Sequence, residues 1–234
     1  MKLCVIPARG GSKRIPKKNI RDFCGKPVIA YSIEAALTAN CFDKVIVSTD
    51  DEEIAEVAKQ YGAEVPFIRP QELADDFTGT SDVVKHAIQW YQDSARSVSF
   101  TCCIYATAPF IMPAYIRQGY KNLKTSSKSY AFTITSFPFP VQRALRINNA
   151  NEIEAIYPEN IFMRSQDLEE AYHDAGQFYW GRSEAFMNNE VIFSAESIPV
   201  ILPRHLVQDI DTLEDWHKAE FMYKSLLLEK ENNQ

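Results

Sequence analysis

Short apolar runs alternate with amphipathic segments from the start of the chain, and this alternation constrains the fold more than any other feature. Buried strands are predicted at residues 3–6, 43–50 and 64–68, and amphipathic helices at 28–37 and 52–61, the latter ended by Gly62. The connections between these segments are short. Strands and helices that alternate in this way predict a parallel sheet covered by helices on both faces.

The same alternation continues toward the C-terminus. Further strands are predicted at 98–105, 130–135, 175–180 and 200–202, and further helices at 83–91, 113–123 and 212–229. Thr80 or Ser81 is expected to cap the helix at 83–91, and Thr212 with Asp215 resembles a capping box before the last helix. We therefore expect one α/β domain over residues 1–234, with a Rossmann-like, mostly parallel sheet sandwiched by helices.

Residues 137–174 interrupt the pattern. The segment opens with Phe-Pro-Phe-Pro and later contains Asn-Asn-Ala-Asn, which is a turn signal. We interpret it as an inserted, hairpin-bearing arm. Exposed aromatic residues there would indicate a contact between subunits, and an arm folded back on its own domain is the alternative.

Charge and cysteine content exclude several classes of protein. A net charge of −6 and a pI near 5.3 argue against a general partner of nucleic acids or anionic membranes. The chain enters a strand directly, without a signal peptide, and no apolar run approaches the roughly 18 residues of a membrane helix. Five cysteines without a C-x-x-C pair make disulfides and zinc poor interpretations. We expect a reducing, cytoplasmic location.

A basic, glycine-bearing loop follows the first strand. It carries a serine and two glycines among five cations: Arg9, Gly10, Gly11, Ser12, Lys13, Arg14, Lys17 and Lys18. Such local basicity in an acidic chain favours a specific anion, and glycine lets backbone N–H groups approach it, which predicts a phosphate cradle. A solvated basic loop is the alternative. The loop matches neither the P-loop pattern nor G-x-G-x-x-G, and Pro7 and Pro16 predict an extended conformation.

Polar residues follow several of the predicted strands, where ligands bind in open parallel sheets. They are residues 9–12 and 48–50, Arg69, Thr107 and Asp209. Asp209 and Asp211 lie two positions apart on an extended segment, so both would face one side and suit Mg²⁺ held together with substrate phosphates. In the alternative, Asp211 only caps the final helix. The four histidines lack metal-ligand spacing, and His173 is a candidate substrate contact.

The motifs together resemble those of the CMP-sialic acid synthetases, or acylneuraminate cytidylyltransferases. The similarity rests on the segments 6–19, 42–50, 69–74 and 209–212, which occur in the family's order and spacing. The resemblance implies transfer of a cytidylyl group from CTP to a nine-carbon 2-keto acid sugar, with Mg²⁺ and release of pyrophosphate. It also implies a homodimer formed through the inserted arm.

The resemblance assigns roles to individual residues. It implies that Arg9, Ser12 and Lys18 contact the triphosphate, and that Ala8, Gly10 and Gly11 also belong to the nucleotide site. Asn19 corresponds to a nucleotide contact near the ribose, and Arg69 to the cytosine reader, with Thr80 and Ser81 alongside. Asp209 and Asp211 correspond to the metal ligands and, with Lys18, to the catalytic residues.

Departures from the sialic acid enzymes fall on the sugar side of the family's site. The glutamine and the arginine of a Gln-Pro-Thr-Ser-Pro-Leu-Arg motif are both absent from residues 105–111, and residues 173–180 replace a segment that includes Pro-Asn-Gly-Ala. Residues 174–179, Asp-Ala-Gly-Gln-Phe-Tyr, resemble the pseudaminic acid branch, which serves bacterial glycan and flagellin modification. The resemblance places the sugar near Tyr105, Thr107, His173, Gln177 and Tyr179.

Alternatives remain within and outside this class. Activation of N-acetylneuraminate, legionaminate or Kdo would use the same nucleotide half. A nucleotide-binding regulatory module without catalysis is disfavoured by the presence of Lys18 and both aspartates. A glycosyltransferase with a D-x-D motif is also disfavoured, because that motif normally follows a mid-chain strand.

Overall fold

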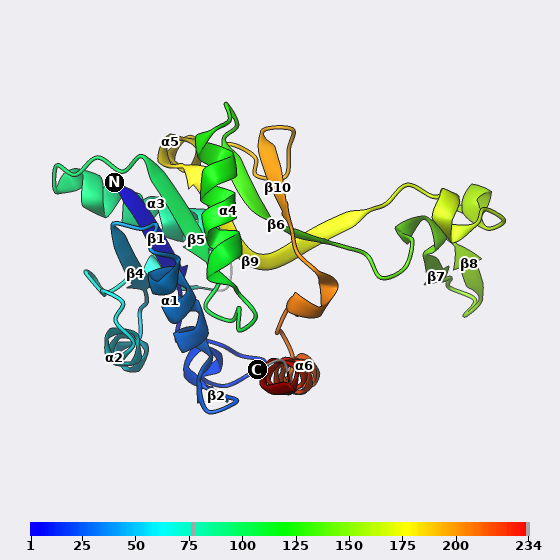
Figure 1. The fold of residues 1–234 in the computed structure, drawn as a ribbon, viewed down its shortest axis with the longest axis horizontal. Helices are drawn as coiled ribbons and strands as arrows, with labels where there is room; N and C mark the ends of the chain where they lie inside the picture. Colours follow the sequence, from blue (N-terminus) through cyan, green and yellow to red (C-terminus); the bar gives the residue numbers. More distant parts are fainter. Residues whose placement is uncertain (76–77, 233–234) are drawn as a thin grey trace.

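The computed structural model describes residues 1–75 and 78–232, with side chains up to residue 229, and its centre is a six-stranded sheet (Figure 1). The strand order is β10-β6-β9-β5-β1-β4. These strands are β1 (Lys2–Pro7), β4 (Lys44–Ser48), β5 (Phe100–Ile104), β6 (Tyr130–Ser136), β9 (Tyr172–Arg182) and β10 (Ser197–Ile201). A hairpin of β2 (Asp22–Phe23) and β3 (Lys26–Pro27) follows the basic loop.

The sheet is mostly parallel, as predicted, with one strand reversed. β1 runs parallel to β4 and β5, and β10 runs parallel to β6. The long β9 is antiparallel to both β5 and β6, between which it lies. It returns from the inserted segment rather than from a helix, so it enters the sheet from the opposite end. The sequence pattern of residues 175–180 carried no signal of this direction.

Helices cover both faces of the sheet. One apolar cluster joins the sheet to α1 (Val28–Ala39), α2 (Glu52–Gln60) and α4 (Pro113–Lys124), and a second joins its other face to α3 (Thr80–Asp93) and α5 (Ser183–Met187). The last helix, α6 (Leu213–Asn232), packs Trp216 against Phe23 of the β2–β3 hairpin. Cys4, Cys102 and Cys103 belong to these buried clusters, and burial raises the pKa of each thiol.

Two predicted local features are wrong. Residues 64–68 do not form a strand, because only Glu64 makes a bridge, to Ile46 of β4. The helix α3 is capped by Gly79 without a side-chain hydrogen bond, and Thr80 and Ser81 lie in its first turn. By contrast, the capping box is present: Asp215 N–H donates to Thr212 Oγ1 at 3.2 Å, and Thr212 N–H donates to Asp215 Oδ2 at 2.8 Å.

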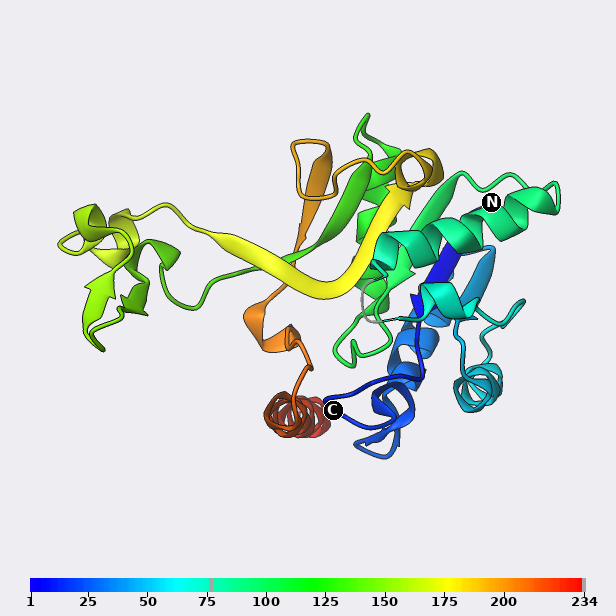
Figure 2. The ribbon, with the colours of Figure 1, turned by 180° about the vertical axis from the view of Figure 1, so that it is seen from behind.

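The segment between β6 and β9 forms an arm that extends away from the sheet instead of folding back on it (Figures 1 and 2). It contains a small hairpin of β7 (Leu145–Ile147) and β8 (Ile153–Ala155). Large apolar side chains are exposed along it, including Phe162 at 96% and Phe139 at 81%. Among the described residues, no helix is both long and apolar enough to span a membrane.

Candidate active site

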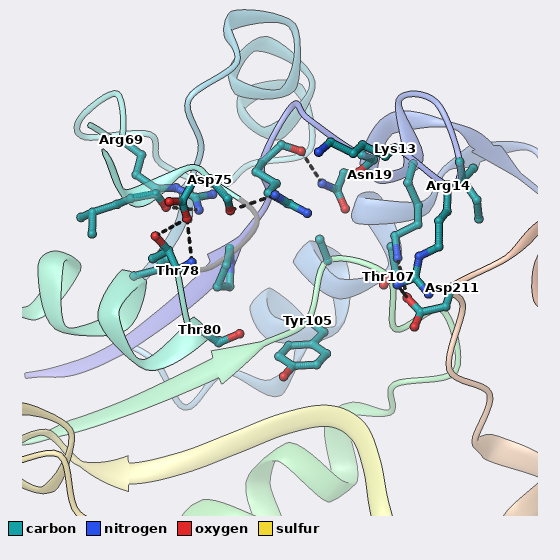
Figure 3. Close-up of a pocket in the computed structure, with 18 residues that line it drawn as sticks. Lys13, Arg14, Asn19, Arg69, Asp75, Thr78, Thr80, Tyr105, Thr107 and Asp211 are labelled. Carbon is teal, nitrogen blue, oxygen red and sulfur yellow. Dashed lines mark hydrogen bonds and ion pairs between the residues drawn. The ribbon is translucent and has the colours of Figure 1, made fainter. Parts of the chain in front are cut away.

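A cavity of about 320 Å³ opens where β1, β4 and β5 end (Figure 3). Its walls come from the basic loop, the start of α3, the loop after β5 and the segment before α6. The lining residues are Pro7, Arg9, Ser12, Lys13, Arg14, Ile15, Lys18, Asn19, Arg69, Leu73, Asp75, Thr78, Thr80, Val83, Tyr105, Ala106, Thr107 and Asp211. Segments separated by up to two hundred positions therefore meet at one edge of the sheet, as ligand sites of open parallel sheets require.

Four of the five loop cations line this cavity, and the fifth does not. Lys17 has a left-handed backbone (φ 52°) and forms an ion pair with Glu53 of α2. Arg9 crosses the cavity and donates to the Asp75 carbonyl oxygen at 2.8 Å. The cavity is thus strongly cationic, which suits a polyphosphate better than a neutral ligand.

The two glycines of the loop have different surroundings. The Gly10 N–H donates to Asp50 Oδ1 at 3.0 Å, and a Cβ at this position would lie 2.6 Å from Asp51 Oδ2. Asp51 in turn caps α2 through the Ile54 N–H. Gly10 therefore lets the loop pack on α2, which corrects the expectation that its N–H is directed at a ligand. A Cβ on Gly11 would meet no atom within 4 Å.

Buried polar residues hold the loop and the facing wall in place. The Asn19 amide donates to the Arg9 carbonyl at 2.9 Å, and Ala8, which is buried, donates its N–H to the Ser48 carbonyl at 2.9 Å. Arg69 is only 4% exposed and donates to the carbonyls of Ser48 at 2.6 Å and Leu73 at 3.2 Å. Burial lowers the pKa of Arg69, and the neighbouring Asp50 charge opposes this.

Asp211 lies against two cations on the far side of the cavity. Its Oδ1 is 2.9 Å from an Arg14 nitrogen and 3.5 Å from Lys18 Nζ, which also donates to the Ile210 carbonyl at 2.7 Å. Asp209 does not line the cavity. Partial desolvation and the nearby Asp211 charge raise the pKa of Asp209, while Lys18 opposes them. Because Thr212 and Asp215 exchange the capping bonds, Asp211 is left with its side chain on the cavity.

A second cavity of about 230 Å³ adjoins the first, and Thr80 and Tyr105 line both. Of the residues expected on the sugar side, Tyr105 and Thr107 line the first cavity and Tyr179 the second. Ser81, which was expected near the base, lines the second cavity and not the first.

Two residues expected to contact the sugar lie elsewhere. Gln177 is buried and donates through Nε2 to the Leu206 carbonyl at 2.6 Å, so it fixes the backbone before α6. His173 packs edge-on against Phe137 at the base of the arm, and its Nδ1 lies 2.8 Å from the Asp174 carbonyl oxygen. Neither lines either of these two cavities.

Sequence reasoning missed three polar residues of these cavities. Asp75 and Thr78 belong to a stretch without strand or helix periodicity, and their position depends on the bond from Arg9 and on Thr78 N–H donating to Asp75 Oδ1 at 2.7 Å. Asp174 lines the second cavity. Asp174 belongs to the motif of residues 174–179, but no feature of the sequence around it indicated that its side chain, rather than a neighbouring one, would line a cavity.

A mostly parallel sheet with a strongly cationic cavity at its carboxyl edge is typical of α/β nucleotide-binding proteins. The chain belongs to the cytidylyltransferase family, whose model matches residues 3–226. It is 47% identical to a pseudaminic acid cytidylyltransferase of Campylobacter jejuni over 95% of this chain and 96% of that one. It is 35% identical to a CMP-N,N'-diacetyllegionaminic acid synthase of Legionella pneumophila, covering 93% and 94% of the two chains.

A solved structure agrees on the fold. That of a CMP:2-keto-3-deoxy-manno-octonic acid synthetase complexed with CTP superposes with a TM-score of 0.69 at 17% identity, covering 96% of this chain and 98% of that one.

Proposed function

We propose that this cytidylyltransferase transfers CMP from CTP to pseudaminic acid and releases pyrophosphate. The observation that carries the choice of sugar is the 47% identity to the Campylobacter jejuni enzyme over nearly the full length of both chains. Identity to the diacetyllegionaminic acid synthase is lower, at 35%. The cationic cavity supports the nucleotide half of this reaction.

We assign the nucleotide to the first cavity. Arg9, Ser12 and Lys18, with the backbone of Gly11, would hold the triphosphate, because cations and loop N–H groups complement phosphate oxygens. Asn19 would lie near the ribose. Arg69 would read the base, with Thr80 alongside, and its two bonds to backbone carbonyls support such a role by fixing its orientation.

The carboxylates before α6 fit a divalent cation that is held together with substrate. The described residues contain no cluster of three or more His, Cys, Asp or Glu side chains able to hold a metal. Asp211 lines the first cavity, and its charge contributes to the raised pKa of Asp209. Two neighbouring carboxylates are donors that suit Mg²⁺ when substrate phosphates supply further oxygens. When bound there, Mg²⁺ would neutralise charge on the triphosphate.

Positioning and charge stabilisation account for the catalysis in this proposal. The anomeric hydroxyl of the sugar attacks the α-phosphorus in line, a new P–O bond forms, and the bond to the β-phosphate breaks as pyrophosphate leaves. Lys18 stabilises the negative charge that develops on the phosphoryl oxygens. Asp211, released from Arg14 and Lys18 when these turn to the triphosphate, accepts the hydroxyl proton.

Pyrophosphate release tests the function. Purified enzyme with CTP and Mg²⁺ is incubated separately with pseudaminate, N,N'-diacetyllegionaminate, N-acetylneuraminate and Kdo, and we expect turnover with pseudaminate alone.

Asp211→Ala serves as the negative control and should lose about a hundredfold or more in kcat. Glu214→Ala, an exposed acid in the first turn of α6, should retain activity. Comparable turnover of N-acetylneuraminate would refute the choice of sugar.

The exposed apolar side chains of the arm favour association of two copies of the chain. Its exposed apolar side chains, of which Phe162 is 96% and Ile153 74% exposed, exceed what an isolated chain usually leaves in water, so we propose a homodimer formed through the arm. CTP as substrate and five unpaired thiols support a cytoplasmic location.

A further inference from the structure

The second cavity is apolar apart from a few polar groups. Its apolar wall is formed by Val84, Cys103, Phe186, Ile192 and Phe193. The polar groups are the hydroxyls of Thr80, Ser81, Tyr105 and Tyr179 and the single carboxylate of Asp174. Because Thr80 and Tyr105 also line the nucleotide cavity, a molecule in the second cavity lies directly beside the nucleotide.

A large bulge in β9 places the carboxylate in this wall. Phe132 of β6 pairs with Tyr179 and Ile134 pairs with Asp174, so residues 175–178 lie opposite the single residue Thr133. Gly176, with φ +60°, makes the turn within the bulge. Asp174 and Tyr179 are thereby brought together although they are five positions apart.

The Asp174 carboxylate is held in place by two hydrogen bonds but can still accept others from a ligand. Its Oδ1 accepts the Gly176 N–H at 3.0 Å, and its Oδ2 accepts the Tyr179 hydroxyl. Tyr179 is itself fixed, because its ring stacks on Phe132. These two bonds use about half of the acceptor sites of a carboxylate. An acceptor of this kind in an apolar wall attracts an N–H or O–H donor and repels another anion.

The negative charge of Asp174 in the second cavity and the cations of the first cavity together orient a sugar acid. Its own carboxylate is repelled by Asp174 and attracted to the cations of the first cavity, which include Lys13 and Arg14 beside the proposed triphosphate contacts. The anomeric carbon, which bears that carboxylate, then lies next to the nucleotide, where the proposed reaction requires it. The opposite end of the sugar enters the second cavity.

We propose that Asp174 is a specificity-determining residue, which accepts a hydrogen bond from the N–H of an acylamino group on the sugar. The methyl of that acyl group packs against the apolar wall, and the Ser81 hydroxyl donates to its carbonyl. This inference rests on the proposed function, because it assumes a sugar acid with acylamino groups, as both pseudaminate and N,N'-diacetyllegionaminate are.

The first test is Asp174→Asn, which conserves shape and removes the charge. Loss of a hydrogen bond to a charged acceptor should lower kcat/KM for pseudaminate by about tenfold to a hundredfold, mainly through KM for the sugar, with KM for CTP unchanged. Glu184→Gln is the matched control, since this exposed acid on α5 lines neither cavity. A raised KM for CTP, or an unchanged KM for the sugar, would overturn the inference.

The second test uses the wild-type enzyme and does not depend on the variant folding. Two pseudaminate analogues each carry an ester oxygen in place of one acylamino nitrogen, so each lacks one N–H donor. One of them should show kcat/KM at least about tenfold below that of pseudaminate. If both analogues match pseudaminate, Asp174 is not the acceptor. If wild-type enzyme releases no pyrophosphate with pseudaminate itself, the proposed function fails instead.

Discussion

At the scale of single residues, Gly10 and Gly11 are neighbours in the same loop, but they differ in the space available for a side chain. A Cβ would clash at Gly10 and would meet no atom within 4 Å at Gly11. The nearest obstacle at Gly10 is the carboxylate of Asp51, which cannot move freely because its other oxygen accepts the Ile54 N–H at the start of α2. Gly11 has open space in the same direction. The loop that we propose to hold the triphosphate is therefore positioned by its contact with the start of a neighbouring helix.

We predict that Gly10→Ala lowers the free energy of unfolding by about 1–3 kcal/mol through overpacking. The variant should also bind CTP more weakly, because the loop must move away from α2. Gly11→Ala is the matched control and should leave stability within about 1 kcal/mol of wild type, since both variants restrict the unfolded chain equally. Thermal unfolding and calorimetric titration with CTP measure both effects. Equal behaviour of the two variants would contradict this account.

At the scale of elements, Asp43 fastens the start of β4 to the start of β1. Its Oδ2 accepts the Lys2 N–H at 2.7 Å, and its own N–H donates to the Lys2 carbonyl at 2.9 Å. The backbone hydrogen bond from Lys2 is the main reason why the pKa of Asp43 lies below its ordinary value. A pKa lowered by folding contributes stability above the unfolded-state value near 4, and this contribution disappears as the pH falls through the folded-state value.

Asp43→Asn should therefore destabilise the protein at pH 7 by about 1 kcal/mol or less, because the side chain is largely solvated. At pH 3 wild type and variant should approach each other in stability, since the wild-type carboxyl is then becoming protonated. Urea unfolding at both pH values measures the difference. A gap that stays constant or widens in acid would show that the charge of Asp43 does not contribute.

At the scale of the whole molecule, the arm exposes large apolar side chains along its length. Phe162 and Ile147 are 96% and 73% exposed, and both belong to the arm, which extends away from the sheet (Figures 1 and 2). Such side chains remain in water only at a cost, which association would remove.

The double variant Phe162→Lys/Ile147→Lys should be monomeric in light scattering, whereas wild type should have the mass of a dimer. Thermal unfolding should show that the sheet domain of the variant remains folded, because neither residue belongs to its buried clusters. Phe221→Lys on α6 is the control: it removes an aromatic side chain that is 70% exposed and should not change the mass. A wild-type protein that is monomeric at micromolar concentration would disprove association through the arm.

The amino-acid sequence by itself determined most of the local elements and the cationic character of the loop after β1. The periodicity around α1 and α2, the buried run of β1 and the capping box at Thr212 are set by neighbouring residues, so they were predictable. The same holds for the cationic loop, because Arg9 and Lys18 lie within ten positions of each other along the chain.

Only the tertiary structure decided what depends on pairing between distant segments. The reversal of β9 follows from the path of the arm, and the bulge that joins Asp174 to Tyr179 follows from its register with β6. The same long-range packing directs Lys17 to Glu53 and Gln177 to Leu206, although sequence position suggested a ligand for Gln177. Such orientations are set by contacts between residues far apart in the chain, which no local pattern records.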